Sequence, residues 1–295
     1  MEKDQTVILE DRGIISVSGT DATDFLQNIL SNDIDKVDNN KSIYSAILTP
    51  QGKYLYDFFV IKYNDAYFLD CDYELTKEII EHLFKYKLRS KLEIKDISSE
   101  YVVGIISLEK FKEIQINEKK NEESILYRGS PLFIDPRKKQ LGARLLSSLE
   151  KLHLTIKKLN LKIIDNINYL EKAHMLGVPI KGTKLLKDKL FGLEANFEKF
   201  NAIDFKKGCY VGQENTARMK LKDKVRKRLL PIQTKKTFDI GSEIIFKKIT
   251  VGKLLISEPY AFALIKLKDP DLKTFINEEL YVNEVKVKIL NKFLD

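Results

Sequence analysis

Apolar and polar positions near the start of the chain alternate in short runs, which predicts β-strands. Residues 5–18 form two such runs around a turn at 11–13, the pattern of two short strands. Apolar runs at 44–48 and 54–62 flank T-P-Q-G-K, and the Pro and Gly of that segment favour a tight turn. We therefore expect a β-hairpin there, followed by a further strand over 66–71.

Apolar residues spaced three or four positions apart predict helices in other parts of the chain. The first helix begins at Thr20 or Asp21, either of which can cap it. Further helices are expected at 75–89, 143–152, 165–177 and 212–219. Pro179 follows the fourth helix and acts as a stop signal. The segment 178–203 lacks periodicity, which predicts a long ordered loop of the kind that is often functional.

The pattern changes after residue 229. Short apolar runs, separated by Pro, Gly and Asn-Glu turns, continue at regular spacing toward the end of the chain. This spacing is typical of a small antiparallel barrel or sandwich. We therefore expect an α+β body over 1–222 and an all-β domain over 223–295.

Bulk composition narrows the class of protein. The 295 residues suit two or three domains, and a hydrophobic content of 43% argues for a folded globular protein. No run approaches the ~18–20 apolar residues needed to span a bilayer, and the first residues lack the pattern of a secretory signal. The two cysteines, Cys71 and Cys209, make no disulfide framework, so we expect a protein of the reducing cytoplasm.

Positive charge is concentrated in one segment. Nine basic and two acidic residues lie between Lys206 and Arg228, a surplus of seven in a chain whose formal net charge is +8. Such a block creates a local positive field that attracts anions. It predicts a site for an anionic partner such as RNA, with a solvated lysine-rich connector as the alternative.

Few residues form a recognisable catalytic or metal-binding pattern. No two histidines have metal-ligand spacing, no CxxC is present, and Gly208 and Gly212 lack the Gly-Lys-Ser/Thr of a phosphate loop. We therefore expect no metal site. Cys209 differs, because Lys206 and Lys207 precede it and a helix is expected just after it, and both features favour the thiolate. A buried cysteine that acts as a small apolar side chain is the alternative.

The segment K-K-G-C-Y-V-G-Q-E at 206–214 resembles the signature of the YgfZ family, the folate-binding relatives of the glycine-cleavage aminomethyltransferase. Similarity continues over 9–34 and 45–58, and in G-V-P and E-A-N-F ahead of the signature. The resemblance thus covers most of the chain, and the family includes a mitochondrial iron–sulfur assembly factor. The signature residues are Lys207, Gly208, Cys209, Tyr210, Gly212, Gln213 and Glu214.

The resemblance implies an aminomethyltransferase-like ring of α+β lobes with a C-terminal antiparallel β-barrel, around a cavity for tetrahydrofolate or a derivative. It implies Glu194 as the carboxylate for the pterin edge and Tyr169 as an aromatic wall, since charge-assisted pairs and flat rings suit a pterin. It also implies Arg12 as a cavity residue and Asn196 as a hydrogen-bonding partner. The ordinary alternatives are a surface glutamate, a core tyrosine and a solvated arginine.

In function, the resemblance implies a folate-binding accessory protein that supports assembly or repair of iron–sulfur clusters and, through cluster enzymes, tRNA modification. Cys209 would be the reactive or cluster-contacting thiol, and iron–sulfur proteins or carriers would be partners. A tetrahydrofolate-dependent aminomethyl- or methyltransferase is the first alternative, for which Asp70, Asp72 and Glu78 are available carboxylates. An RNA-binding module at Lys206–Arg228 is the second.

Overall fold

The structure is a computed structural model that describes residues 1–290. The chain folds into two compact units and passes between them several times. Unit 1 consists of residues 1–47, 56–169 and 199–211. Unit 2 consists of residues 48–55, 170–198 and 212 onward. The expected domain boundary after residue 222 lies inside unit 2.

A six-stranded sheet forms one half of unit 1, with the strand order β11-β1-β7-β10-β9-β8. All neighbouring strands are antiparallel except β1 and β11, which are parallel. The strands are β1 (Gln5–Leu9), β7 (Val102–Ile106), β8 (Ser124–Tyr127), β9 (Ser130–Ile134), β10 (Ala143–Ser147) and β11 (Lys162–Ile163).

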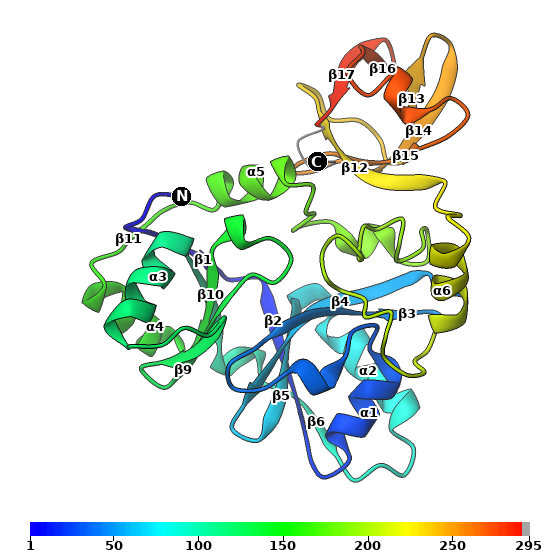
Figure 1. The fold of residues 1–295 in the computed structure, drawn as a ribbon. Coiled ribbons are helices and arrows are strands. Elements are labelled where there is room, and N and C mark those ends of the chain that lie inside the picture. Colours follow the sequence, from blue (N-terminus) through cyan, green and yellow to red (C-terminus); the bar gives the residue numbers. More distant parts are fainter. Residues whose placement is uncertain (291–295) are drawn as a thin grey trace. The chain divides into compact units, whose positions relative to one another are not determined.

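Two helices, α3 (Leu108–Asn117) and α4 (Leu149–Lys158), pack against this sheet (Figure 1). Phe111 of α3 and Leu152 of α4 belong to one buried apolar cluster with Leu132 and Leu145 of the sheet. The prediction of one helix over 143–152 was wrong in its first half, where β10 lies. All five residues of β10 are buried, including Arg144 and Ser147. A strand without an exposed face lacks the alternation of apolar and polar residues that would separate it from a helix.

A five-stranded sheet, in the order β3-β4-β5-β2-β6, forms the other half of unit 1. Its strands are β2 (Arg12–Ser18), β3 (Ile43–Leu48), β4 (Tyr54–Tyr63), β5 (Ala66–Asp72) and β6 (Glu93–Asp96). The expected strands and hairpin of the first 71 residues are thereby confirmed. Helices α1 (Ala22–Ile29) and α2 (Thr76–Lys87) follow β2 and β5 in sequence and confirm the first two predicted helices.

The two sheets of unit 1 are joined by a buried ion-pair triad. Asp70 of β5 accepts hydrogen bonds from Arg12 of β2 and from Arg144 of β10. Asp70 is 1% exposed and Arg144 is 2% exposed. A buried charge is tolerated only when it is paired and hydrogen-bonded, so the triad links the sheets through one carboxylate.

Unit 2 contains a closed barrel of six strands, in the order β12-β15-β14-β13-β16-β17, and this confirms the predicted all-β tail. The strands are β12 (Lys227–Gln233), β13 (Glu243–Phe246), β14 (Ile249–Ile256), β15 (Phe262–Lys266), β16 (Leu280–Val282) and β17 (Val285–Ile289). Helix α6 (Gln213–Leu221) precedes the barrel, and α5 (Ile167–Met175) contains the unit boundary at residue 169. Within residues 1–290, no helix combines the length and apolar character needed to cross a membrane.

Candidate functional site

The first part of the signature segment, residues 207–211, forms a loop of unit 1 that is fixed to the C-terminal end of α1. The Lys207 ammonium group is buried and donates hydrogen bonds to the carbonyl oxygens of Gln27 (2.6 Å), Leu30 (2.7 Å) and Asn32 (3.1 Å). The last carbonyl groups of a helix lack partners within the helix and attract positive charge. Burial lowers the pKa of Lys207 to about 8. Lys207 therefore anchors the loop by donating hydrogen bonds to carbonyl groups at and just after the C-terminal end of α1.

Further contacts hold the loop on both sides of Cys209. After the cysteine, the Val211 amide donates to the carbonyl oxygen of Asn28 (3.2 Å), and the buried Tyr210 ring lies 5.2 Å from the Lys207 ammonium. Before it, the Asp204 carboxylate accepts from the Lys206 amide (2.6 Å). Cys209 itself is exposed. The fold thus presents a solvent-accessible thiol on a fixed backbone, and the alternative of a buried apolar cysteine is wrong.

The two glycines of the signature have different physical roles. A Cβ at Gly208 would meet no atom within 4 Å, so nothing in the described structure requires glycine there. Gly212 has φ = +86°, and a Cβ there would lie 2.4 Å from the carbonyl oxygen of Thr49. Only glycine fits such a position without strain. Gly212 is therefore needed for the turn into α6, whereas Gly208 leaves open space beside Cys209.

The basic block is divided between the two units. Lys206 and Lys207 belong to unit 1, and the remaining basic residues belong to unit 2. Gln213 and Glu214 open α6, and the Glu214 carboxylate pairs with Arg218 one turn later. Lys220 pairs with Glu198. The positive charge of the Lys206–Arg228 block is thus partly neutralised by acidic side chains. Its basic residues do not form a single stripe on one helix.

Asp70, one of the candidate carboxylates, is held in the ion-pair triad of unit 1. Burial by itself would raise the pKa of Asp70, but Arg12 and Arg144 outweigh it and lower that pKa. A carboxylate that is held ionised by two guanidinium groups is a poor proton acceptor, and Arg12 is paired instead of solvated. Cys71 is fully buried, and burial raises its pKa to about 12. Burial likewise raises the pKa of Asp72.

The predicted folate residues Tyr169 and Glu194 lie in different units. Tyr169 of unit 1 is 2% exposed, and within residues 1–290 its hydroxyl group has no hydrogen-bond partner. Such a group is costly to bury, which marks this hydroxyl as a candidate ligand contact. Glu194 of unit 2 is half-buried, its Oε2 accepts from the Phe191 amide (3.0 Å), and burial raises its pKa.

Asn196 connects the loop of unit 2 to the first barrel strand. Its Nδ2 donates to the carbonyl oxygen of Leu229 (2.6 Å), and its Oδ1 accepts from Arg228 Nη1 (3.1 Å). The side chain is 0% exposed. Its amide thus has a structural role in unit 2, and the expected pterin contact stays a prediction.

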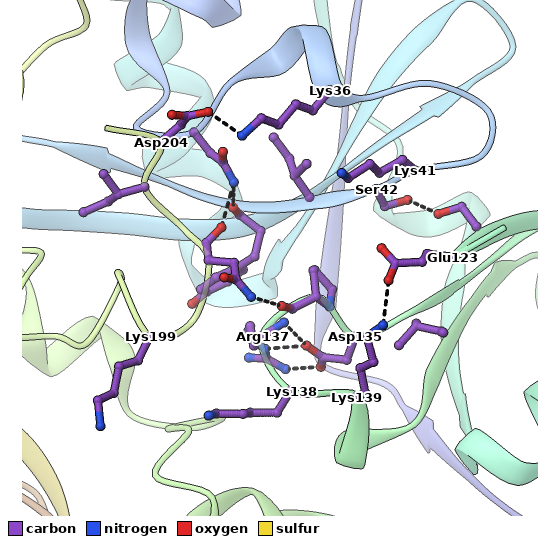
Figure 2. A pocket seen from close by; sticks show the side chains of 18 of the residues that line it. Lys36, Lys41, Ser42, Glu123, Asp135, Arg137, Lys138, Lys139, Lys199 and Asp204 are labelled. Carbon is purple, nitrogen blue, oxygen red and sulfur yellow. Dashed lines mark hydrogen bonds and ion pairs between the residues drawn. The ribbon is translucent and has the colours of Figure 1, made fainter. Parts of the chain in front are cut away.

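One basic cleft of unit 1 was missed from the sequence. It has a volume of about 760 Å³ and is lined in part by Arg137, Lys138 and Lys139 (Figure 2). The signal was present as the run P-R-K-K at 136–139, which stands outside the Lys206–Arg228 block. Among residues 1–290, no three His, Cys, Asp or Glu side chains gather as a metal site.

Comparison with known proteins defines the class of this fold. Residues 9–107 match the GCVT N-terminal domain. The structure resembles the glycine cleavage system aminomethyltransferase T from Bartonella henselae with a TM-score of 0.73 and 11% identity, covering 99% of this chain and 86% of that chain. The fold is therefore aminomethyltransferase-like, with mixed helices and sheets and a closed C-terminal antiparallel barrel, as predicted.

Sequence relatives identify the branch of this class. The chain is 32% identical over 228 residues to the mitochondrial iron–sulfur cluster assembly factor IBA57 homolog of Pyricularia oryzae, covering 76% of this chain and 56% of that protein. The homolog of Dictyostelium discoideum is 28% identical over 258 residues, covering 77% and 62%. The match spans little more than half the length of these relatives. The chain belongs to the aminomethyltransferase-like family that includes the IBA57 proteins, and the predicted resemblance is confirmed.

The expected cytoplasmic location is contradicted by these relatives, which are named as mitochondrial proteins. The expectation rested on two cysteines that form no disulfide framework. Unpaired thiols argue against an oxidising compartment, but they do not separate the cytosol from the interior of an organelle.

Proposed function

We propose that this protein supports the assembly or repair of iron–sulfur clusters, with Cys209 as the thiol that contacts the cluster during transfer. The observation that carries the proposal is the exposed Cys209 on a loop fixed from both sides by Lys207 and Val211. The names of the IBA57 relatives support the same role. A fixed loop presents the sulfur to a partner without a cost for ordering the backbone.

The cluster is cargo in this proposal. Cysteine thiolates are the usual ligands of cluster iron, and one exposed thiol supplies one ligand. Cys71 does not add a second, because it is fully buried and its pKa is raised to about 12. The remaining ligands therefore come from a carrier or target protein that docks at the Cys209 loop, where Gly208 leaves the backbone open.

Cluster transfer tests the proposal. The purified chain is mixed anaerobically with a donor protein that carries a labile [2Fe–2S] cluster and with an apo-acceptor, and cluster arrival is followed by visible circular dichroism. We expect Cys209→Ser to abolish the acceleration given by the wild type and Cys71→Ala to keep it. Equal acceleration by wild type and Cys209→Ser would exclude a direct role for this thiol.

We also propose reduced folate as a ligand, supported by the family, with one predicted contact in each unit that is argued and tested by itself. Tyr169 would offer its buried hydroxyl group, which has no partner within the described chain. Glu194 would offer its half-buried carboxylate, one oxygen of which already accepts from the Phe191 amide. Each group by itself suits part of a pterin: a tyrosine suits the flat ring, and a carboxylate accepts from the N–H donors.

Calorimetric titration with tetrahydrofolate tests this ligand independently of the cluster. Tyr169→Phe removes one hydroxyl group and Glu194→Gln removes one charge, and each change should weaken binding about five- to tenfold if it deletes one hydrogen bond of ~1–1.5 kcal/mol. Glu81→Gln, on the exposed face of α2, is the control and should bind as the wild type does. Unchanged affinity in both site variants would refute the contacts.

An effect on tRNA modification is proposed as an indirect consequence of cluster supply. Cells that lack the protein should lose the modifications made by cluster-containing enzymes, and wild type but not Cys209→Ser should restore them. Restoration by Cys209→Ser would place the effect outside cluster chemistry.

A further inference from the structure

A cleft in unit 1 carries a strong surplus of positive charge. Four separate segments of unit 1 line a hollow of about 760 Å³ with seven basic and three acidic side chains, a surplus of four. The lysines are Lys36, Lys41, Lys138, Lys139, Lys199 and Lys206. Figure 2 shows Lys36 and Lys41 on one side of the cleft and Lys138, Lys139 and Lys199 across from them. A hollow lined by one sign of charge concentrates the field and attracts counter-ions.

The three acidic residues of the cleft are neutralised within it. Asp135 accepts two hydrogen bonds from the Arg137 side chain (3.0 and 2.7 Å), and both residues are buried. Asp204 pairs with Lys36, and Glu123 pairs with Lys139 (2.8 Å). Lys41 and Lys206 also line the cleft, are exposed, and form no ion pair with another residue of the described chain.

The surroundings of Arg137 determine which cations of the cleft a ligand can contact. The Arg137 guanidinium group stacks over the rings of Phe59 (4.6 Å) and Tyr44 (5.3 Å), and the Nε–Nη2 edge of its fork is used by Asp135. The accessible cations are therefore mainly lysines. An ammonium group acts as a point charge and does not read planar geometry as an arginine fork does. Phosphate and carboxylate groups both satisfy such a site.

We propose that this cleft binds a small polyanion that carries two or more phosphate or carboxylate groups. A volume of about 760 Å³ lies in the range of small-molecule sites, and the exposed ammonium groups of Lys41 and Lys206 suit a ligand with two or more negative groups. The cations converge on a hollow instead of following a continuous stripe, which favours a compact ligand over an extended RNA backbone. The site adds a ligand to the proposed function and does not depend on the thiol.

Titration calorimetry with tripolyphosphate and with citrate, at low salt, tests the site. The test variant is Lys41→Glu with Lys206→Glu, since both lysines are exposed on the rim. The control is Lys77→Glu with Lys85→Glu, an equal change of charge on the exposed face of α2. We expect one anion per chain, at least tenfold weaker binding in the test variant, and binding within twofold of wild type in the control.

Each outcome is decisive. Tighter binding of tripolyphosphate assigns a phosphorylated ligand, and tighter binding of citrate assigns a polycarboxylate. Equal losses in test and control variants, several anions per chain, or binding of an RNA hairpin without binding of either small anion would overturn the proposal. Cys209→Ser should bind the anion as the wild type does, so failure of the cluster role and failure of this site are distinguishable.

Discussion

Replacement of Asp70 by asparagine tests how far unit 1 depends on its buried ion-pair triad. The carboxylate accepts three hydrogen bonds, from Arg12 Nε (2.6 Å) and from Arg144 Nε and Nη2 (3.0 and 2.6 Å). Asp70→Asn keeps the shape, removes the negative charge and leaves two guanidinium groups without their counter-ion. The two sheets of unit 1 then lose the carboxylate that links them.

The magnitude follows from these contacts. Hydrogen bonds to charged groups contribute ~1.5–3 kcal/mol each, which sets an upper range of ~4.5–9 kcal/mol for the three. Measured losses on breaking one partner of a buried pair are ~3–5 kcal/mol. We expect the free energy of unfolding to fall by about 4 kcal/mol, a large part of the ~5–15 kcal/mol of a typical domain.

Urea unfolding at pH 7, followed by far-ultraviolet circular dichroism, measures the loss. With a slope of ~3 kcal/mol/M, the midpoint should drop by about 1–2 M. Asp65→Asn, the same chemical change at an exposed turn between β4 and β5, should cost less than ~0.5 kcal/mol. Since the pKa of Asp70 is lowered, the wild-type advantage should persist above about pH 4 and vanish as the pH falls through the folded-state pKa. A loss in Asp70→Asn no larger than that in Asp65→Asn would refute the reasoning.

Four other substitutions test the cysteine loop and the barrel unit. Gly212→Ala should lower the free energy of unfolding by more than ~2 kcal/mol, because Gly212 has a positive φ and lies close to backbone atoms. Gly208→Ala should change the free energy of unfolding in urea by less than ~0.5 kcal/mol. Equal effects of the two substitutions would contradict the roles assigned to these glycines. Lys207→Met removes the hydrogen-bond donor of three carbonyl groups, so the free energy of unfolding should fall by about 3 kcal/mol. The loosened loop should also speed the labelling of Cys209 by maleimide. An unchanged labelling rate would argue that Lys207 does not anchor the loop. Burial lowers the pKa of His174, so the unfolded chain binds that proton more readily and stability should fall as the pH drops from about 6.5 toward 5. His174→Phe should lose less stability than wild type between pH 7.5 and 5, and an equal or larger loss would exclude this residue as the cause.

Local pattern was sufficient for much of the fold. The hairpin of β3 and β4 follows from alternation around Pro50 and Gly52, and the barrel follows from evenly spaced short runs. β10 was mistaken for a helix because all its residues are buried. The helix α3 was not predicted at all, since its polar stretch gave a weak pattern.

The candidate site was predictable in its residues but not in its contacts. The signature motif located Cys209, but the partners of Lys207 lie 175 to 180 positions away in sequence. Arg12 and Arg144 lie 58 and 74 positions from Asp70. Spacing along one segment carries no information about such pairs, so the sequence does not indicate that Lys207 bonds carbonyl groups at the end of α1 or that Arg12 pairs with Asp70.

The interleaving of the two units sets an order of events during protein synthesis. Unit 1 includes residues 199–211, and Ser31 and Asn32 near its start donate hydrogen bonds to the backbone oxygens of Ala202 and Asn201. A nascent chain therefore cannot complete its first unit until residue 211 has been synthesised. A ribosome that stops after residue 169 would release neither unit in finished form, so this protein is made whole or is exposed to proteases as an incomplete product.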